Sequence, residues 1–183
     1  MNLWLRLFAL IFSFAFRPRI PLPEGFSSRA FRVLPSDIDA NLHMTNGRYP
    51  CFVDLTRLDF FVRTRMIQTA FQRDWRPMML ASKFRFRREL KPFRKFRVET
   101  RLRWWDGTNL VFESRFLTRA RDRSEILSAI SLERTCFYAR KDKSLVPVED
   151  LFAAMGRSGL APPPASAEIL AFMQTEDEIR RAN

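Results

Sequence analysis

The side chains best suited to chemistry lie together in one short stretch, residues 36–49. This stretch contains two acids, Asp37 and Asp39, and the only histidine of the chain, His43. A carboxylate can attack a carbonyl carbon or activate a water molecule for that attack, and a histidine can give or take a proton near neutral pH. Residues 36–49 are therefore the candidate site for nucleophilic or acid–base chemistry.

The same residue types also form turns and helix caps, and taken singly most of them fit that simpler role. Asp and Asn favour turns, and Asn46 is well placed to cap the N-terminus of a helix. A β-prone run precedes the stretch and a helical pattern follows it. Rigid elements on both sides would fix the geometry of a site built there.

The elements around the stretch follow from the spacing of apolar residues. Residues 29–34 predict a strand, and apolar residues three and four apart predict a helix from Gly47 to about Thr69, with room for a break. Later strands are predicted in residues 82–89, 96–104, 109–119 and 125–140. One strand, one long helix and then a run of strands indicate the α+β class.

Both ends of the chain extend beyond this body. Residues 3–16 are almost wholly apolar, but a helix of that length reaches only about 21 Å, against roughly 30 Å for a bilayer core. We expect an uncleaved anchor, residues 1–17, at the cytoplasmic face of a membrane, because arginines flank it. The alternative is a helix packed on the domain or on another subunit. The expected domains are the anchor, a linker (18–25), the central domain (26–146) and a helical extension (147–183).

Composition limits the partners of the chain. The formal net charge is +12, which suits nucleic acid, an acidic lipid surface or the phosphates of coenzyme A. The basic residues are scattered and no nucleic-acid motif accompanies them, so nucleic acid is the least favoured of the three. No Cys/His set has metal-ligand spacing, and neither a metal nor a cofactor is expected. A serine nucleophile is not expected either, because the Gly-x-Ser-x-Gly motif is missing.

The motif resembles the hotdog-fold thioesterases related to 4-hydroxybenzoyl-CoA thioesterase, and among them the thioesterase superfamily member six type. The resemblance covers roughly residues 29–140. It is carried by residues 32–39, Leu42-His43-Met44, Asn46 and Arg48-Tyr49. The Asp39-x-Asn41-x-His43 spacing is also similar to that of plant acyl-carrier-protein thioesterases. Arg87-Arg88-Glu89 resembles the segment that carries a catalytic glutamate in the plant enzymes, where a cysteine stands in place of Leu90.

The resemblance implies a fold and an active site. The fold would be a hotdog, in which an antiparallel sheet of about five strands wraps around one long helix. Asp39 would be the catalytic carboxylate, supported by Asn41 and His43, while Asp37 would shape the turn. Glu89 is a further catalytic candidate. By strand parity, Glu89 falls on the face of its predicted strand that is assigned to solvent. Three alternatives stay open: a bulge turns its side chain inward, a partner subunit covers that face, or Glu89 is simply a surface acid.

The resemblance also implies a substrate and an assembly. Asn46, Arg48, Tyr49 and Arg88 are the expected substrate-binding residues, and the backbone donors at the start of the helix would polarise the thioester carbonyl. The expected protein is a homodimer, or a dimer of dimers. It would hydrolyse a fatty or aromatic acyl-CoA or an acyl-carrier-protein thioester. The alternative is a catalytically inactive hotdog protein that binds acyl thioesters or lipid at a membrane.

Overall fold

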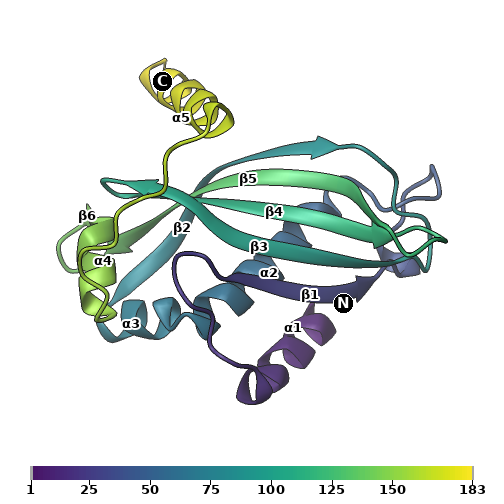
Figure 1. Cartoon of the computed structure of the whole chain (residues 1–183), viewed down its shortest axis with the longest axis horizontal. Helices are drawn as coiled ribbons and strands as arrows, with labels where there is room; N and C mark the ends of the chain where they lie inside the picture. The colour runs from purple at the N-terminus through teal and green to yellow at the C-terminus, as the bar shows by residue number, and fades with distance from the viewer. Residues whose placement is uncertain (1, 183) are drawn as a thin grey trace. The chain divides into compact units, whose positions relative to one another are not determined.

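The structure, a computed structural model, describes residues 2–182 (Figure 1). Met1 of the predicted anchor and Asn183 of the predicted extension lie outside the described residues. The elements in chain order are α1 (Asn2–Ser13), η1 (Phe14–Phe16), β1 (Phe26–Arg32), η2 (Pro35–Asp37), α2 (Arg48–Arg63), α3 (Met66–Gln72), β2 (Trp75–Phe86), β3 (Lys95–Asp106), β4 (Asn109–Arg119), β5 (Glu125–Ala139), β6 (Ser144–Leu145), α4 (Val148–Ala154) and α5 (Ala167–Arg181).

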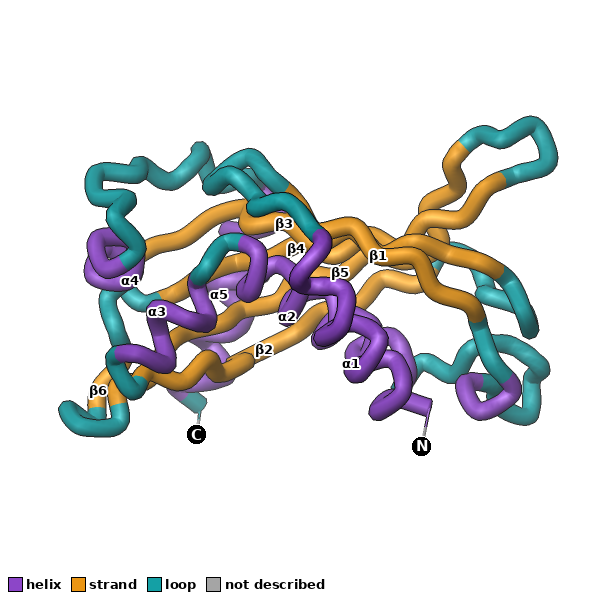
Figure 2. Tube along the Cα trace, turned by 90° about the horizontal axis from the view of Figure 1, so that it is seen from below, coloured by secondary structure: helices purple, strands orange, loops and turns teal. Residues whose placement is uncertain are grey.

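The strands form one curled antiparallel sheet in the order β1-β3-β4-β5-β2, and β6 pairs with β5 (Figures 1 and 2). The pairing of β1 with β3 sets Phe26 opposite Arg101 and Arg32 opposite Lys95. Gly107, which has a positive φ, lies in the tight turn between β3 and β4, as the Asp106-Gly107 pair predicts. The predicted α+β class, with a sheet, a long helix and helical ends, is confirmed.

The chain divides into two compact units. The first contains the N-terminal segment through Thr64 with residues 84–101 and 114–130, and the second contains residues 65–83, 102–113 and the C-terminal segment from Ser131. In the first unit, the apolar face of α2 packs on strands β3, β4 and β5. The buried residues of this core are Val33, Met44, Tyr49, Phe52, Val53, Leu90, Phe96, Val98, Phe116 and Ala129. Tyr49, Phe52 and Val53 are three and four residues apart, so they share one helix face.

The second unit has its own core. Ile169, Phe172 and Met173 of α5 are buried with Val111 of β4, again at helical spacing. Trp105 meets Phe152 of α4 edge to face, with 5.2 Å between ring centroids. The domain boundaries predicted from the sequence stay predictions, because each unit draws on several separate segments.

The prediction left room for a break in the long helix, and the structure has one, whereas two strands differ from it: β1 covers Phe26–Arg32 rather than residues 29–34, and β2 differs at both ends. The helix predicted over 47–69 is broken at Arg65, whose φ of 67° ends one helix and starts the next. Strand β2 begins at Trp75 rather than at residue 82, and it ends at Phe86. Its early part contains Pro77 and a continuous apolar run, so it lacks the alternation that marks a half-buried strand. An edge strand tolerates both features, since one side of its backbone needs no partner in the sheet.

None of the helices in residues 2–182 is long and apolar enough to cross a membrane.

Candidate active site

The turn between β1 and α2 is closed by its own backbone hydrogen bonds. Thr45 N–H donates to the Asp37 carbonyl at 2.9 Å, and Asp39 N–H donates to the His43 carbonyl at 3.1 Å. Leu42, at the tip, has a positive φ of 58° and an exposed side chain. Its N–H donates to the Asp39 carbonyl at 3.1 Å. Residues 37–45 therefore form a compact loop that leads directly into α2.

This loop brings Asp39 and His43 together. The Asp39 Oδ2 to His43 Nδ1 distance is 3.6 Å, and the two side chains are 30% and 28% exposed. Asn41 contributes its backbone N–H, which donates to Asp39 Oδ1 at 2.9 Å. His43 Nδ1 also lies 3.2 Å from the Met44 carbonyl. Two acceptors at Nδ1 favour a proton there, which leaves Nε2 as the ring atom that faces other partners.

Asp37 is fully buried and serves the shape of the turn, as predicted. Its Oδ1 accepts hydrogen bonds from Arg48 at 2.9–3.0 Å. Its Oδ2 accepts one from Arg6 at 2.7 Å and one from the Leu34 N–H at 2.9 Å. A buried carboxylate is costly unless such partners surround it. The arrangement fixes the start of the loop that carries Asp39.

The segment after β2 lies against the same turn. Met44 N–H donates to the Leu90 carbonyl at 2.9 Å, and the Leu90 side chain is buried in the core. Arg87 and Arg88 both donate their N–H groups to the Ser128 carbonyl, a bulge-like arrangement. A surface hollow of about 730 Å³ lies here. Its lining residues are Arg87, Arg88, Glu89, Lys91, Pro92, Arg94, Thr118, Ile126 and Ser128.

Glu89 lies beyond the end of β2, so the parity argument that assigned it to a strand face was wrong. Its carboxylate is exposed and forms an ion pair with Lys91 at 3.3 Å. The hydrogen bond from Met44 places the neighbouring residue, Leu90, against the Asp39 turn. Among the described residues, the ion pair of Glu89 is with Lys91 rather than with a residue of the turn.

The start of α2 corrects three further expectations. The N-cap residue is Gly47 rather than Asn46, whose carbonyl instead accepts the Tyr49 N–H at 3.3 Å. The Arg48 N–H donates to the Thr45 carbonyl at 2.9 Å, and Pro50 has no N–H. The first three positions of the helix therefore offer no spare donor for a thioester carbonyl. The Arg48 guanidinium is occupied by Asp37.

Tyr49 is a core residue rather than a surface contact. It is 2% exposed, and its ring lies against Phe86 and Phe116 at centroid distances of 4.8 and 4.9 Å. Burial raises the pKa of the Tyr49 phenol to about 12. The Tyr49 side chain is thus part of the core of the first unit.

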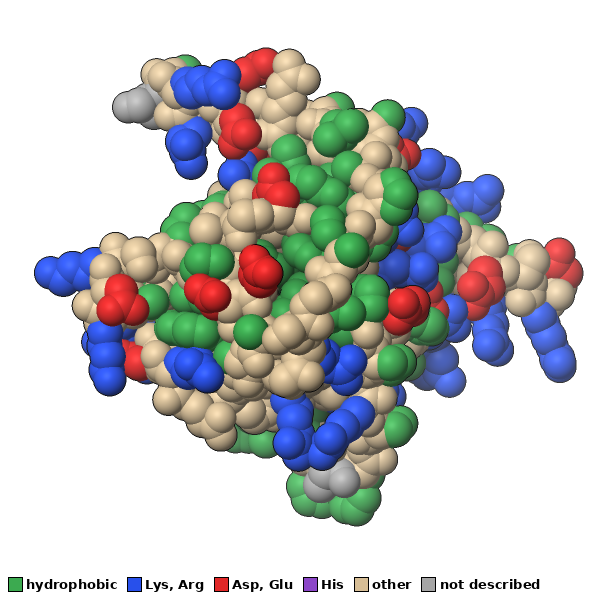
Figure 3. Space-filling view, turned by 60° about the vertical axis from the view of Figure 1, so that its left-hand side comes forward, with side chains coloured by type: hydrophobic (Ala, Val, Ile, Leu, Met, Phe, Trp, Pro, Cys, Tyr) green, Lys and Arg blue, Asp and Glu red, His purple; other side chains and the backbone are tan. Residues whose placement is uncertain are grey.

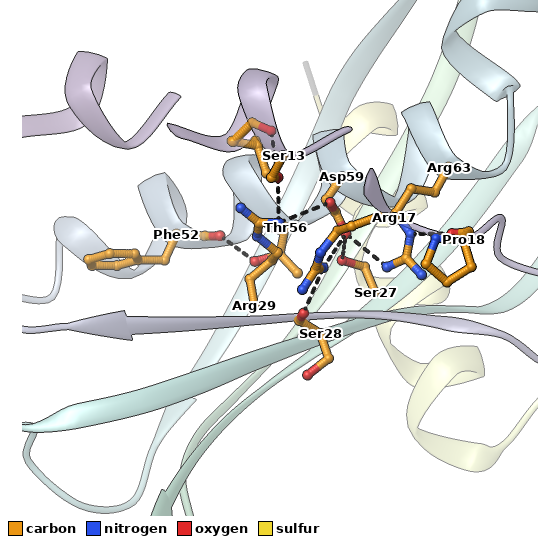
Figure 4. Close-up of polar contacts among 11 residues, drawn as sticks. Ser13, Arg17, Pro18, Ser27, Ser28, Arg29, Phe52, Thr56, Asp59 and Arg63 are labelled. Atoms are coloured by element: carbon orange, nitrogen blue, oxygen red, sulfur yellow. Dashed lines mark hydrogen bonds and ion pairs between the residues drawn. The ribbon is translucent and has the colours of Figure 1, made fainter. Parts of the chain in front are cut away.

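Two buried ionic contacts of α2 and the turn were not anticipated, one at each end of the helix. Arg6 reaches Asp37 from α1. Near the other end of α2, Asp59 lies buried among arginines (Figure 4). Asp59 falls seven residues after Phe52, on the helix face that packs inward, and an acid at such a position signals a buried ion pair. No signal in the sequence links Arg6 to Asp37, because the two are 31 residues apart.

No cluster of histidine, cysteine or acidic residues within residues 2–182 has the arrangement of a metal site. Asp39 and His43 lie together at the turn, and the Asn41 N–H donates to the Asp39 carboxylate.

A curled antiparallel sheet packed on a long helix, with an acidic turn at the start of that helix, defines a hotdog-fold protein. The chain matches the thioesterase-like superfamily over residues 33–171. It belongs to this superfamily, so the resemblance found in the sequence is confirmed.

Solved structures and curated relatives agree with this family. A probable thioesterase from Escherichia coli, YbaW, aligns with a TM-score of 0.64 at 14% identity, over 72% of this chain and 97% of that one. A mutant 4-hydroxybenzoyl CoA thioesterase complexed with 4-hydroxybenzoyl CoA aligns with a TM-score of 0.62 at 13% identity, over 71% and 98%. The protein THEM6 of Xenopus laevis is 31% identical over 102 residues, which are 56% of this chain and 48% of that protein. The chain thus spans about half the length of that curated relative.

The burial of Tyr49 predicts a loss of stability at high pH. The phenol titrates near 10 in an unfolded chain and at about 12 in the folded protein, so the folded state binds the proton more tightly. This contribution is complete below pH 10 and disappears as the pH rises to 12. We expect the free energy of unfolding to fall by about 2–3 kcal/mol over that range from this group. In the Tyr49→Phe variant, the free energy of unfolding measured in urea should fall by about 2–3 kcal/mol less between pH 10 and pH 12 than in wild type. An equal fall in both proteins would contradict the burial of the Tyr49 phenol.

Proposed function

We propose that the chain is an acyl-CoA thioesterase that hydrolyses fatty or aromatic acyl thioesters. Membership of the thioesterase-like superfamily supports thioester hydrolysis in general. The observation that carries the specific proposal is the Asp39–His43 pair, held 3.6 Å apart and partly exposed at the start of α2.

Hydrolysis at this turn needs three events. Asp39 takes a proton from a water molecule while the water oxygen attacks the thioester carbon, or Asp39 attacks directly and water then cleaves the anhydride. The oxyanion collapses, the carbon–sulfur bond breaks, and the thiolate takes a proton. With its ring doubly protonated, His43 can donate a hydrogen bond from Nε2 to the oxyanion or to the leaving sulfur, while Nδ1–H stays directed at Asp39 and the Met44 carbonyl. Because the first three positions of α2 have no spare N–H, His43 and the Asn41 side chain carry this stabilisation.

The hollow lined by basic residues beside the turn is the proposed binding site for the phosphate groups of coenzyme A. Arg87, Arg88 and Arg94 line it, and their guanidinium groups suit phosphate oxygens. Figure 3 shows that Lys and Arg side chains occur in many places on the protein surface. This hollow is distinguished by its position, because it adjoins Leu90, whose carbonyl accepts the Met44 N–H of the turn. A hypothetical protein from Staphylococcus aureus with a TM-score of 0.60, at 13% identity over 79% of this chain and 92% of that one, was solved in complex with CoA. Of the four residues expected to bind substrate, Arg88 is the one that the hollow favours.

The inactive binder is the second candidate. The position of Glu89 outside the strand, and Leu90 where plant enzymes have cysteine, favour it. On this alternative the same hollow holds an acyl thioester that is not cleaved.

A thiol-release assay with a panel of acyl-CoAs separates these two candidates. Asp39→Asn should lower kcat about a hundredfold or more, because the general base or nucleophile is lost. Asp142→Asn, at an exposed acid in the turn between β5 and β6, is the matched control and should keep kcat within about twofold. Equal turnover by wild type and Asp39→Asn would remove Asp39 from its role. Saturable binding without turnover by wild type would support the inactive binder.

We also propose that the chain forms a homodimer through the free edge of β2. Most residues along β2 are exposed, among them Met78, Leu80 and Phe86, each more than 40% exposed. An edge strand with exposed apolar side chains is a template for pairing with another chain. The exposed Leu42 at the tip of the turn is a further apolar group available to a partner.

If the chain pairs through β2, charged side chains introduced on this strand should disrupt the dimer. The double variant Met78→Lys/Leu80→Lys should elute as a monomer in light-scattering chromatography, because lysines on an edge strand disfavour strand pairing. Leu170→Lys adds a lysine at an exposed leucine of α5 and should leave the dimer intact. A dimer that persists in the double variant would contradict pairing through this edge.

Membrane association through residues 1–17 is the last part of the proposal. The outward face of α1 and η1 exposes Trp4, Phe8, Phe12 and Phe16, spaced four residues apart. Aromatic residues at this spacing form one apolar stripe, which suits a helix lying in the membrane interface. Arginines near the stripe favour an anionic, cytoplasmic leaflet.

Sedimentation with phosphatidylglycerol vesicles tests this stripe in the full chain. Phe8→Ser/Phe12→Ser should lower the vesicle-bound fraction about tenfold or more, since two buried aromatic rings are lost from the interface. Phe71→Ser, at an exposed phenylalanine of α3, should bind as wild type does. Undiminished vesicle binding by the double variant would contradict the role of α1.

A further inference from the structure

The inward face of α1 carries a charged residue that the body of the protein surrounds. Arg6 is only 13% exposed, and its Nη2 lies 2.7 Å from Asp37 Oδ2. The same atom donates to the Arg32 carbonyl at 3.0 Å, and the guanidinium lies 4.5 Å from the centre of the Phe52 ring. Arg6 thus joins α1 to β1, to α2 and to the beginning of the Asp39 turn.

The far end of α1 is held by a separate buried carboxylate (Figure 4). Asp59 on α2 has no exposed surface, and it accepts a hydrogen bond from Ser27 Oγ at 2.6 Å. Arg63 and Arg17 approach its Oδ2 at 3.2 and 3.5 Å. Arg29 lies 3.6 Å from Oδ1 and donates to Ser13 Oγ at 2.8 Å. Burial lowers the pKa of Arg29, and the Asp59 charge acts in the opposite direction.

These two attachments hold α1 at Arg6, in the first half of the helix, and at Ser13, its last residue. The family model matches residues 33–171, and α1 and β1 lie before the matched range. The outward stripe and the inward ion pairs lie on opposite sides of the same helix. An anchor that served as a tether alone would need neither of the two buried carboxylates, and each of them is costly without its arginines.

We propose that Arg6 is a positioning residue of the active site, which holds the Asp39 turn through Asp37. The proposal rests on the proposed hydrolysis at Asp39. Asp37 accepts from Arg6 on one oxygen and from Arg48 on the other, while its carbonyl accepts the Thr45 N–H that closes the turn. Asp39 follows two residues later. Loss of Arg6 removes a charged partner from a buried carboxylate and loosens the loop that sets the Asp39–His43 distance.

Three variants of the full chain test this tie: Arg6→Gln, Arg6→Lys and Arg17→Gln. The last loosens the Asp59 end of α1 and serves as the matched control. Amide hydrogen exchange in residues 37–45 should rise about tenfold in Arg6→Gln, because opening of the loop costs less free energy. The value of kcat should fall about tenfold to a hundredfold with KM within about twofold, as expected when a reacting group is misplaced. Arg6→Lys should restore part of both.

Arg17→Gln should leave exchange in residues 37–45 and kcat within about twofold of wild type, although it also lowers the melting temperature. Equal losses in Arg6→Gln and Arg17→Gln would reduce Arg6 to a general stabiliser and overturn the proposal. Unchanged exchange in Arg6→Gln would overturn it as well. Amide hydrogen exchange reports on the Arg6–Asp37 contact even if the protein has no thioesterase activity. Failure of the proposed hydrolysis and failure of the positioning role of Arg6 therefore give different results.

Discussion

The buried carboxylate of Asp37 is the interaction on which the candidate site depends. A fully buried anion is tolerated only where cations and N–H groups surround it, and here these come from α1, from α2 and from the Leu34 peptide. Each partner belongs to a different part of the chain. The carboxylate therefore gathers three segments at one point, two residues before Asp39. The charge of Asp37 supports geometry, while the partly exposed charge of Asp39 is available for chemistry.

Helix α2 extends the same arrangement from the turn into the core. Phe52 packs on Phe31 and Phe96, with centroid distances of 5.0 and 4.9 Å, and Arg6 lies over its ring. Seven residues further along, Asp59 repeats the pattern of a buried carboxylate that holds the N-terminal segment. Aromatic packing and paired charge thus fix one face of α2 against the sheet and another against α1. The turn at the start of this helix is therefore held from both the core and α1.

Much of this arrangement could be predicted from the sequence, because local patterns encode it. The apolar residues of α2, the alternation in β3 and the Asp106-Gly107 turn report directly on local structure, and the Asp39-x-Asn41-x-His43 motif predicts the candidate site at the turn where Asp39 and His43 lie together. Features that depend on distant partners could not be read in this way. The contact of Arg6 with Asp37 spans 31 residues, and the end of β2 before Glu89 depends on how Arg87 and Arg88 meet Ser128. Tyr49 stands in the motif like a binding residue, and only packing shows that its ring belongs to the core.

The central claim is that the loop held by Asp37 presents Asp39 to a thioester carbon. A crystal structure of the chain with a non-hydrolysable acyl-CoA analogue tests it most directly. The account predicts an Asp39 carboxylate oxygen within about 3.5 Å of the carbon that replaces the thioester carbonyl, or one water molecule between them. An analogue bound where neither Asp39 nor His43 contacts it would contradict the account.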